Sequence, residues 1–158
     1  MVEAVREQAG HLMHVSNLLY SEPAVRFAER LCESSLGGRA FLTNSGTANE
    51  CVIKLARKHA QRRGIAEPEI VTLERSFLGR TMGPLAATPG SNPDFGPMPP
   101  GFLAVPIGEP EVLRAAVGAP AAAVMIEPVL GCVYEVPDEI LVAAREACDT
   151  RRGAADRR

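Results

Sequence analysis

Short apolar segments that alternate with amphipathic helical patterns are the feature that most constrains how this chain can fold. The expected strands are residues 39–43, 70–73, 102–105 and 121–126. The first expected helix opens at residues 21–23 and stops at 37–38, and the second follows residues 44–47 and is capped at Gly64. Three further helices are expected at residues 81–88, 109–117 and 138–148. Strands that are apolar along their whole length are typical of parallel sheets buried on both faces. The pattern therefore predicts an α/β fold of three layers, with helices on both faces of a mostly parallel sheet.

The length and the distribution of charge predict one domain followed by a tail. A chain of 158 residues allows one ordinary domain and argues against two. We expect residues 1–20 to form an N-terminal segment, residues 21–149 to form the α/β domain or part of it, and residues 150–158 to form a basic tail. The tail has four arginines and no Leu, Ile, Val or Phe, so the apolar pattern stops at Thr150.

Composition excludes several classes of partner. The net charge of −2 gives no electrostatic basis for binding nucleic acid or anionic lipid, and 4% aromatic residues are too few for a base-stacking surface. No apolar run approaches the roughly 20 residues that a membrane-spanning helix needs. The wide spacing of the cysteines fits reduced thiols, and His11 and His14 have no third ligand nearby. The sequence thus predicts a cytoplasmic protein with no metal site and no membrane or nucleic-acid partner.

The turn at Asn44–Thr47, between an expected strand and an expected helix, is the first candidate site. The N–H groups of a first helical turn have no partner within the helix, and together with the helix dipole they attract phosphate. Gly46 allows the backbone to approach such an anion closely. Asn, Ser and Thr are also the residues that ordinarily cap helices, so capping and phosphate binding are both open interpretations of this turn.

Two further candidates follow expected strands, at the edge where open parallel sheets bind ligands. After strand 70–73 come Phe77, which can stack on a planar cofactor, and Arg80, which can bind a carboxylate through two parallel hydrogen bonds. After strand 121–126 comes Glu127, a possible carboxylate of the same site. The alternatives are a core position for Phe77, a surface position for Arg80, and a cap or an ion pair for Glu127.

Taken together, these segments resemble class III aminotransferases. The motifs that carry the resemblance occur in the family's order and are HVSNL at 14–18, NSGTANE at 44–50, KLAR at 54–57, FLGRT at 77–81 and IEPV at 126–129. The resemblance covers roughly residues 12–149. Within the family it is greatest to acetylornithine aminotransferases, with ornithine and 4-aminobutyrate aminotransferases as close relatives.

The resemblance implies a fold-type-I enzyme that uses pyridoxal 5′-phosphate and acts as a homodimer. At the matching positions, Ser45, Gly46 and Thr47 would hold the cofactor phosphate. Phe77 would stack on the pyridine ring, and Arg80 would bind a substrate carboxylate. The implied reaction moves an amino group from N-acetylornithine, or a related ω-amine, to 2-oxoglutarate, with the cofactor ring as electron sink.

The chain departs from the family's pattern in ways that bear on catalysis. The family usually reads NSGTEANE, one residue longer than residues 44–50, and it has His or Trp where this chain has Leu78. The family's second glutamate after the E-P motif is missing. Neither Lys54 nor Lys58 matches the position of the catalytic lysine. We therefore expect a chain cut short near Asp149, by truncation or a frameshift, and inactive alone.

An alternative reading is a non-catalytic fragment or scaffold domain that pairs with a full-length homologue. A dinucleotide-binding module is disfavoured, because the glycine fingerprint and the acidic partner for a ribose are both missing.

Overall fold

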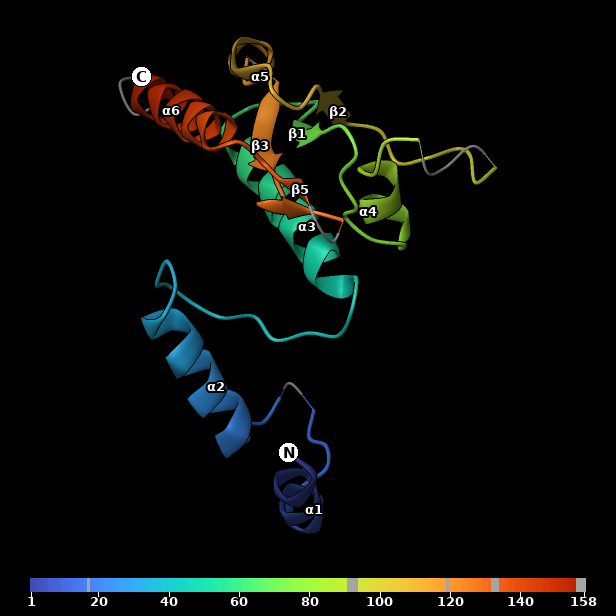
Figure 1. Cartoon of the computed structure of the whole chain (residues 1–158), viewed down its shortest axis with the longest axis vertical. Coiled ribbons are helices and arrows are strands. Elements are labelled where there is room, and N and C mark those ends of the chain that lie inside the picture. Colours follow the sequence, from blue (N-terminus) through green and yellow to red (C-terminus); the bar gives the residue numbers. More distant parts are fainter. Residues whose placement is uncertain (17, 91–93, 119, 132–133, 156–158) are drawn as a thin grey trace. The chain divides into compact units, whose positions relative to one another are not determined.

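Internal contacts divide the chain into two units. This computed structural model describes residues 1–16, 18–90, 94–118, 120–131 and 134–155. The units are Met1–Thr43 and Asn44–Arg158 (Figure 1). The boundaries that the sequence suggested, after residues 20 and 149, stay predictions.

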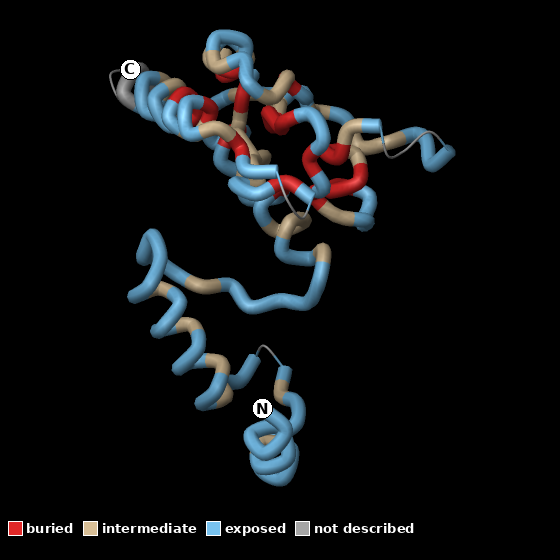
Figure 2. The backbone as a smooth tube through the Cα atoms, viewed as in Figure 1, coloured by how far each residue is buried: buried red, intermediate tan, exposed pale blue. Residues whose placement is uncertain are grey.

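The first unit consists of two helices without a core. Helix α1 spans Val2–His11, and helix α2 spans Glu22–Glu33 with Ser21 as its N-cap. Helix α2 opens where the sequence predicted, with Pro23 in its first turn, but it ends at Glu33, before the expected stop at residues 37–38. No described residue of this unit is buried (Figure 2). The exposed apolar side chains on α2 are Val25, Phe27 and Leu31. This unit therefore has no apolar interior of its own.

The strand predicted at residues 39–43 is wrong. These residues form no regular secondary structure, and Phe41 and Leu42 are exposed. A strand is stabilised by backbone hydrogen bonds to a neighbouring strand. Among the described residues, no strand pairs with this segment, so its apolar character does not produce a strand.

A three-stranded parallel sheet organises the second unit. Its strands are β1 (Glu69–Leu73), β2 (Phe102–Val105) and β3 (Ala121–Met125), in the order β2-β1-β3. Helix α4 (Met82–Ala86) connects β1 to β2, and helix α5 (Pro110–Ala116) connects β2 to β3. The predictions of a parallel sheet and of these strands are confirmed.

Helices cover both faces of this sheet, which confirms the predicted three-layer architecture (Figure 1). Helix α3 (Thr47–Arg62) contacts β1 and β3 on one face, and α5 and α6 (Asp138–Ala155) pack on the other. The fully buried side chains of the layer that contains α5 and α6 include Val71, Leu73, Leu113 and Ile140. Successive residues of a strand point to opposite faces, so the buried Ile70 points to the α3 side.

The end of the chain is more regular than the sequence suggested. Helix α6 continues to Ala155, whereas its expected end was at about residue 148. Arginine and alanine are strong helix formers, so the loss of apolar residues after Thr150 does not end the helix. A loop was expected before α6, but strands β4 (Val129–Leu130) and β5 (Tyr134–Glu135) pair there in antiparallel fashion.

The sequence of α3 places Val52, Ala56, His59 and Ala60 on one stripe, which predicts them as the buried face, but the observed buried face differs. Ala60 is buried and Ala56 is half-buried, but Val52 and His59 are exposed. Ile53, seven residues before Ala60 and therefore on the same helix face, is buried instead. Helix α3 is thus rotated by about one residue from the orientation that the sequence pattern favoured.

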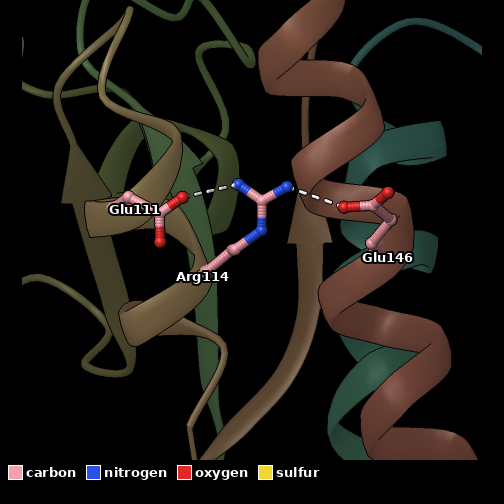
Figure 3. A network of polar contacts seen from close by, with 3 residues as sticks. All are labelled: Glu111, Arg114 and Glu146. Atoms are coloured by element: carbon pink, nitrogen blue, oxygen red, sulfur yellow. Dashed lines mark hydrogen bonds and ion pairs between the residues drawn. The ribbon is translucent and has the colours of Figure 1, made fainter.

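An ion-pair network joins α5 to α6 (Figure 3). The Arg114 guanidinium donates hydrogen bonds to Glu111 at 3.1 Å and to Glu146 at 2.6 Å. The hydrogen bond to Glu146 is the main cause that raises the pKa of Arg114, so this group is charged at every physiological pH. The network orients α5 and α6 relative to each other. It adds little to the stability of the fold, because the two carboxylates are exposed.

Replacing the buried Ile140 with Ala should lower the free energy of unfolding by about 2–5 kcal/mol, because the change removes apolar contacts and leaves a cavity. The matched control is Val142→Ala on the exposed side of the same helix, which should change the free energy by less than about 0.5 kcal/mol. Urea unfolding followed by circular dichroism measures both values. Equal losses in the two variants would contradict the position of Ile140 in the core.

Candidate functional site

The ends of two neighbouring strands meet at the carboxyl edge of the sheet. After β1 the chain enters the loop 74–81, and after β3 it reaches Glu127. The Glu127 carboxylate accepts a hydrogen bond from the backbone N–H of Phe77, with 2.7 Å between Oε2 and N. The structure thus brings two of the predicted site residues together. It gives Glu127 a backbone partner, in place of the helix cap or ion pair considered from sequence.

Two side chains fasten the first turn of α3 to the same region. Asn49 Nδ2 donates a hydrogen bond to the carbonyl oxygen of Leu78 at 2.5 Å, and Glu50 Oε1 accepts one from the N–H of Gly83 at 3.0 Å. A Cβ atom on Gly83 would lie 2.7 Å from Glu50 Oε2, so a larger residue there would make the Glu50 carboxylate shift. These bonds fix the start of α3 against the loop and against α4.

The turn at residues 44–47 consequently lies beside the loop that carries Phe77 and Arg80. A Cβ atom on Gly46 would lie 3.2 Å from Thr81 Cγ2 and 3.3 Å from its Oγ1. Ser45 has a φ of 52°, in the left-handed region, which lets the chain turn sharply into the helix. The segments that hold the predicted site residues therefore converge on one part of the second unit.

Hydrogen bonds from the interior hold the backbone of the loop. The N–H of Leu78 donates to Thr88 Oγ1 at 3.0 Å, and the Thr88 hydroxyl donates to the carbonyl oxygen of Pro84 at 2.8 Å. Gly79 has a φ of 134°, and a Cβ atom there would lie 2.9 Å from Pro84 Cβ. Leu78 is buried, so its side chain belongs to the support of the loop and not to its outer surface.

Phe77 and Arg80 lie on the outside of this loop and contact each other. The guanidinium carbon of Arg80 is 4.8 Å from the centroid of the Phe77 ring, within the range of a cation–π contact. Phe77 is 46% exposed, so the core position considered from the sequence is wrong. Arg80 is exposed, as its surface interpretation expected.

Sequence reasoning assigned no role to Asn49, Glu50, Ser76 or Thr88. The available signal for Asn49 and Glu50 was their place in a first helical turn, but nothing in the sequence identified the loop that they bind. Ser76 is only 2% exposed, and its Oγ has no hydrogen-bond partner among the described residues. The local sequence pattern gave no indication that Ser76 or Thr88 has a role near the candidate site.

The groups at the start of α3 suit a phosphate. The N–H groups of Gly46 and Asn49 donate no hydrogen bond to any described backbone carbonyl, and the side chains of Ser45 and Thr47 are exposed. Free N–H groups at a helix N-terminus, together with the dipole, favour phosphate binding. The exposed ring of Phe77 suits the face of a planar ring. These residues therefore fit the phosphate and the pyridine ring of pyridoxal 5′-phosphate.

Metal-ligand clusters and membrane-spanning helices are both absent from the residues that the structure describes. Within that part of the chain, no group of three or more His, Cys, Asp or Glu residues could hold a metal ion. None of the helices described there combines the length and the apolarity that crossing a membrane requires.

Replacing Glu127 with Ala should loosen the loop at Phe77. The lost hydrogen bond to a half-exposed carboxylate should lower the free energy of unfolding by about 1–2 kcal/mol and speed hydrogen exchange at the Phe77 amide. Glu135→Ala, at an exposed position of β5, is the control and should change neither quantity appreciably. Urea unfolding and amide exchange read out the two effects. Unchanged exchange at Phe77 in the Glu127 variant would contradict this contact.

Known sequences match nearly the whole chain. The family described as "Aminotransferase class-III" matches residues 1–153. Acetylornithine aminotransferase of Methanocaldococcus jannaschii is 41% identical over 157 residues, which are 96% of this chain and 39% of that protein. Acetylornithine aminotransferase of Gloeobacter violaceus is 44% identical over 155 residues, which are 94% of this chain and 39% of that protein. The chain thus spans about 39% of the length of these curated relatives.

Solved structures match the fold. The crystal structure of N-acetylornithine aminotransferase from Stenotrophomonas maltophilia has a TM-score of 0.74 at 35% identity, and the match covers 94% of this chain and 37% of that one. Ornithine aminotransferase from Toxoplasma gondii shares the fold with a TM-score of 0.83 at 24% identity, over 96% of this chain and 38% of that one. The family match over residues 1–153, together with the identities to curated relatives, shows that this chain belongs to the class III aminotransferases.

Proposed function

We propose that this chain supplies the cofactor phosphate site and the substrate carboxylate site of an acetylornithine-type aminotransferase. The reaction moves an amino group from N-acetylornithine, or a related ω-amine, to 2-oxoglutarate. The observation that carries this proposal is the convergence of the turn at residues 44–47 with the loop that bears Phe77 and Arg80. The names of the curated relatives supply the amino donor.

Ser45, Gly46 and Thr47 hold the phosphate of pyridoxal 5′-phosphate in this proposal. The free N–H of Gly46 and the hydroxyls on either side of it donate hydrogen bonds, and the positive end of the α3 dipole adds electrostatic attraction. Phe77 stacks on the pyridine ring through the ring face that Arg80 does not cover. When bound, the cofactor supplies an electron sink for the exchange of an amino group with a carbonyl oxygen.

Arg80 binds the carboxylate of the amino donor or of the 2-oxo acid. Its guanidinium is planar and permanently charged, and it can form two parallel hydrogen bonds with a carboxylate. The contact with Phe77 limits the positions that this side chain can take. Glu127 acts as a positioning residue, because its carboxylate binds the backbone N–H of Phe77.

We further propose that these 158 residues do not transaminate by themselves. The sequence has two lysines, Lys54 and Lys58, and both are exposed on α3, outside the group of residues that converges at the candidate site. The alternative is a non-catalytic fragment or scaffold that pairs with a full-length homologue. The exposed apolar side chains of α2 favour some pairing, either with a second copy as in a homodimer or with such a homologue.

Titration with pyridoxal 5′-phosphate, followed by absorbance and by quenching of tyrosine emission, tests the cofactor site. Thr47→Val should weaken binding about tenfold or more, because it removes a hydrogen bond to a charged group. Phe77→Ala should weaken it about threefold to tenfold through the lost ring contact. The controls Thr150→Val and Phe95→Ala, both at exposed positions, should bind like the unaltered chain. Equal affinity in all of the variants would contradict the proposed site.

An activity assay tests the second part of the proposal. The full 158-residue chain, mixed with pyridoxal 5′-phosphate, N-acetylornithine and 2-oxoglutarate, should form no glutamate above the level of a protein-free control. Borohydride treatment should leave no stable cofactor label on Lys54 or Lys58. Turnover or specific labelling would refute the inactivity of the chain. Sedimentation velocity of the chain, alone and with a full-length acetylornithine aminotransferase, distinguishes a homodimer from pairing with a homologue.

A further inference from the structure

The turn at residues 44–47 and the loop 74–81 are far apart along the chain, so the backbone alone does not fix the distance between them. Helix α3, which follows the turn, has 16 residues, and β1 then returns the chain to the loop. At 1.5 Å per residue the helix is about 24 Å long. Its buried side chains are Ile53 and Ala60. A small slide of α3 on the sheet would therefore move the turn relative to the loop, unless direct contacts hold the two together.

Asn49 supplies a direct contact next to the ring of the candidate site. Its Nδ2 donates a hydrogen bond to the carbonyl oxygen of Leu78 at 2.5 Å, and Leu78 follows Phe77 directly in the chain. The contact of Glu50 with the N–H of Gly83 lies further along, at the start of α4. Asn49 thus joins the first turn of α3 to the part of the loop that carries the ring.

Asn49 also completes the hydrogen bonding of Leu78. The N–H of Leu78 donates to Thr88 Oγ1 at 3.0 Å, whereas no described backbone N–H donates to the Leu78 carbonyl oxygen, which is bound by Asn49. With both polar groups bound, the backbone beside Phe77 cannot rotate without breaking a hydrogen bond. Loss of the Asn49 carboxamide would break the bond that comes from α3 and would leave the bond from Thr88 in place.

A ligand with two joined groups gains from both of them only where the two binding sites are correctly spaced. Joining raises the effective concentration of the second group, and the gain over either group alone can reach about 10²–10⁴. The gain is lost when the two sites move apart, and binding constellations must be held to within about 0.5 Å. The proposed cofactor is such a ligand, because its phosphate would bind at residues 45–47 and its ring at Phe77.

We propose that Asn49 is a positioning residue that sets the distance between the turn at residues 44–47 and the ring of Phe77. It thereby makes the site selective for a molecule that carries a phosphate and a planar ring on one rigid frame, over phosphate alone or the ring alone. Asn49 itself contacts neither group of the ligand in this proposal. The inference rests on the proposed function, and it adds to it the residue that couples the two parts of the cofactor site.

Three ligands test the proposal in the full chain. Pyridoxine 5′-phosphate carries both groups, pyridoxine carries only the ring, and inorganic phosphate carries only the anion. None of them has an aldehyde that could react with Lys54 or Lys58. The ¹⁵N amide shifts of Gly46 and Phe77 follow each titration and also measure weak affinities.

Asn49→Ala should weaken the binding of pyridoxine 5′-phosphate about tenfold or more, because the two groups no longer reach their sites together. It should change the affinities for pyridoxine and for inorganic phosphate by less than about twofold, since each part of the site stays intact. The matched control is Gln61→Ala, which removes an exposed carboxamide from the same helix, and it should bind all three ligands like the unaltered chain.

Direct contacts give a different pattern of losses. Thr47→Val should weaken the binding of phosphate and of pyridoxine 5′-phosphate but not of pyridoxine. Phe77→Ala should weaken the binding of pyridoxine and of pyridoxine 5′-phosphate but not of phosphate. Only a residue that positions the two parts should affect the joined ligand alone, so this pattern separates Asn49 from a residue that touches the ligand.

Two results would overturn the role of Asn49 and leave the proposed function standing. One is equal weakening of all three ligands by Asn49→Ala, which would show a general structural role. The other is unchanged binding of pyridoxine 5′-phosphate in that variant, while Thr47→Val and Phe77→Ala still weaken it. If the unaltered chain does not bind pyridoxine 5′-phosphate at all, the proposed cofactor site and the role of Asn49 are both wrong.

Discussion

The pairing of β1 with strands on both of its edges is the constraint on which the second unit depends. Backbone hydrogen bonds to β2 and β3 hold β1 in the middle of the sheet, and its alternating side chains support a helix layer on each face. The chain can leave this strand only at its carboxyl end, and the loop 74–81 begins there. The position of the candidate site therefore follows from the same pairing that builds the core.

Around that loop, three polar side chains from neighbouring elements bind backbone groups and leave Phe77 and Arg80 exposed. Glu127, Asn49 and Glu50 each contact a backbone group between Phe77 and Gly83. Side chains that fix a loop in this way hold its exposed groups in a narrow range of positions. A binding site for a small molecule requires such fixed positions. The ring of Phe77 and the guanidinium of Arg80 thus stand on a rigid backbone, although both are exposed.

The sequence predicted the strands of the parallel sheet, β1, β2 and β3, because apolar character on both faces is a strong local signal, and it missed the short pair β4 and β5. The strand that the sequence predicted at residues 39–43 is wrong, because a strand also needs a neighbouring strand to pair with. The local sequence does not show whether such a neighbour exists. The motifs identified the turn at 44–47 and the loop at 77–81. They could not identify the bond from Asn49 to Leu78, because it joins residues 29 positions apart and leaves no periodic trace. The length of α6 was missed because helix propensity outweighed the change in polarity.

The conformation of Gly79 in the loop has a consequence for how homologues of this chain are compared. Gly79 is required by its φ of 134° and by the nearness of Pro84, whereas a Cβ atom at Gly83 would only make the Glu50 carboxylate shift. That requirement comes from folding and is independent of any chemical step. A lineage that gave up transamination but kept this architecture would retain Gly79, so the preservation of this residue over evolutionary time would reflect selection for the fold and would not indicate surviving enzymatic activity.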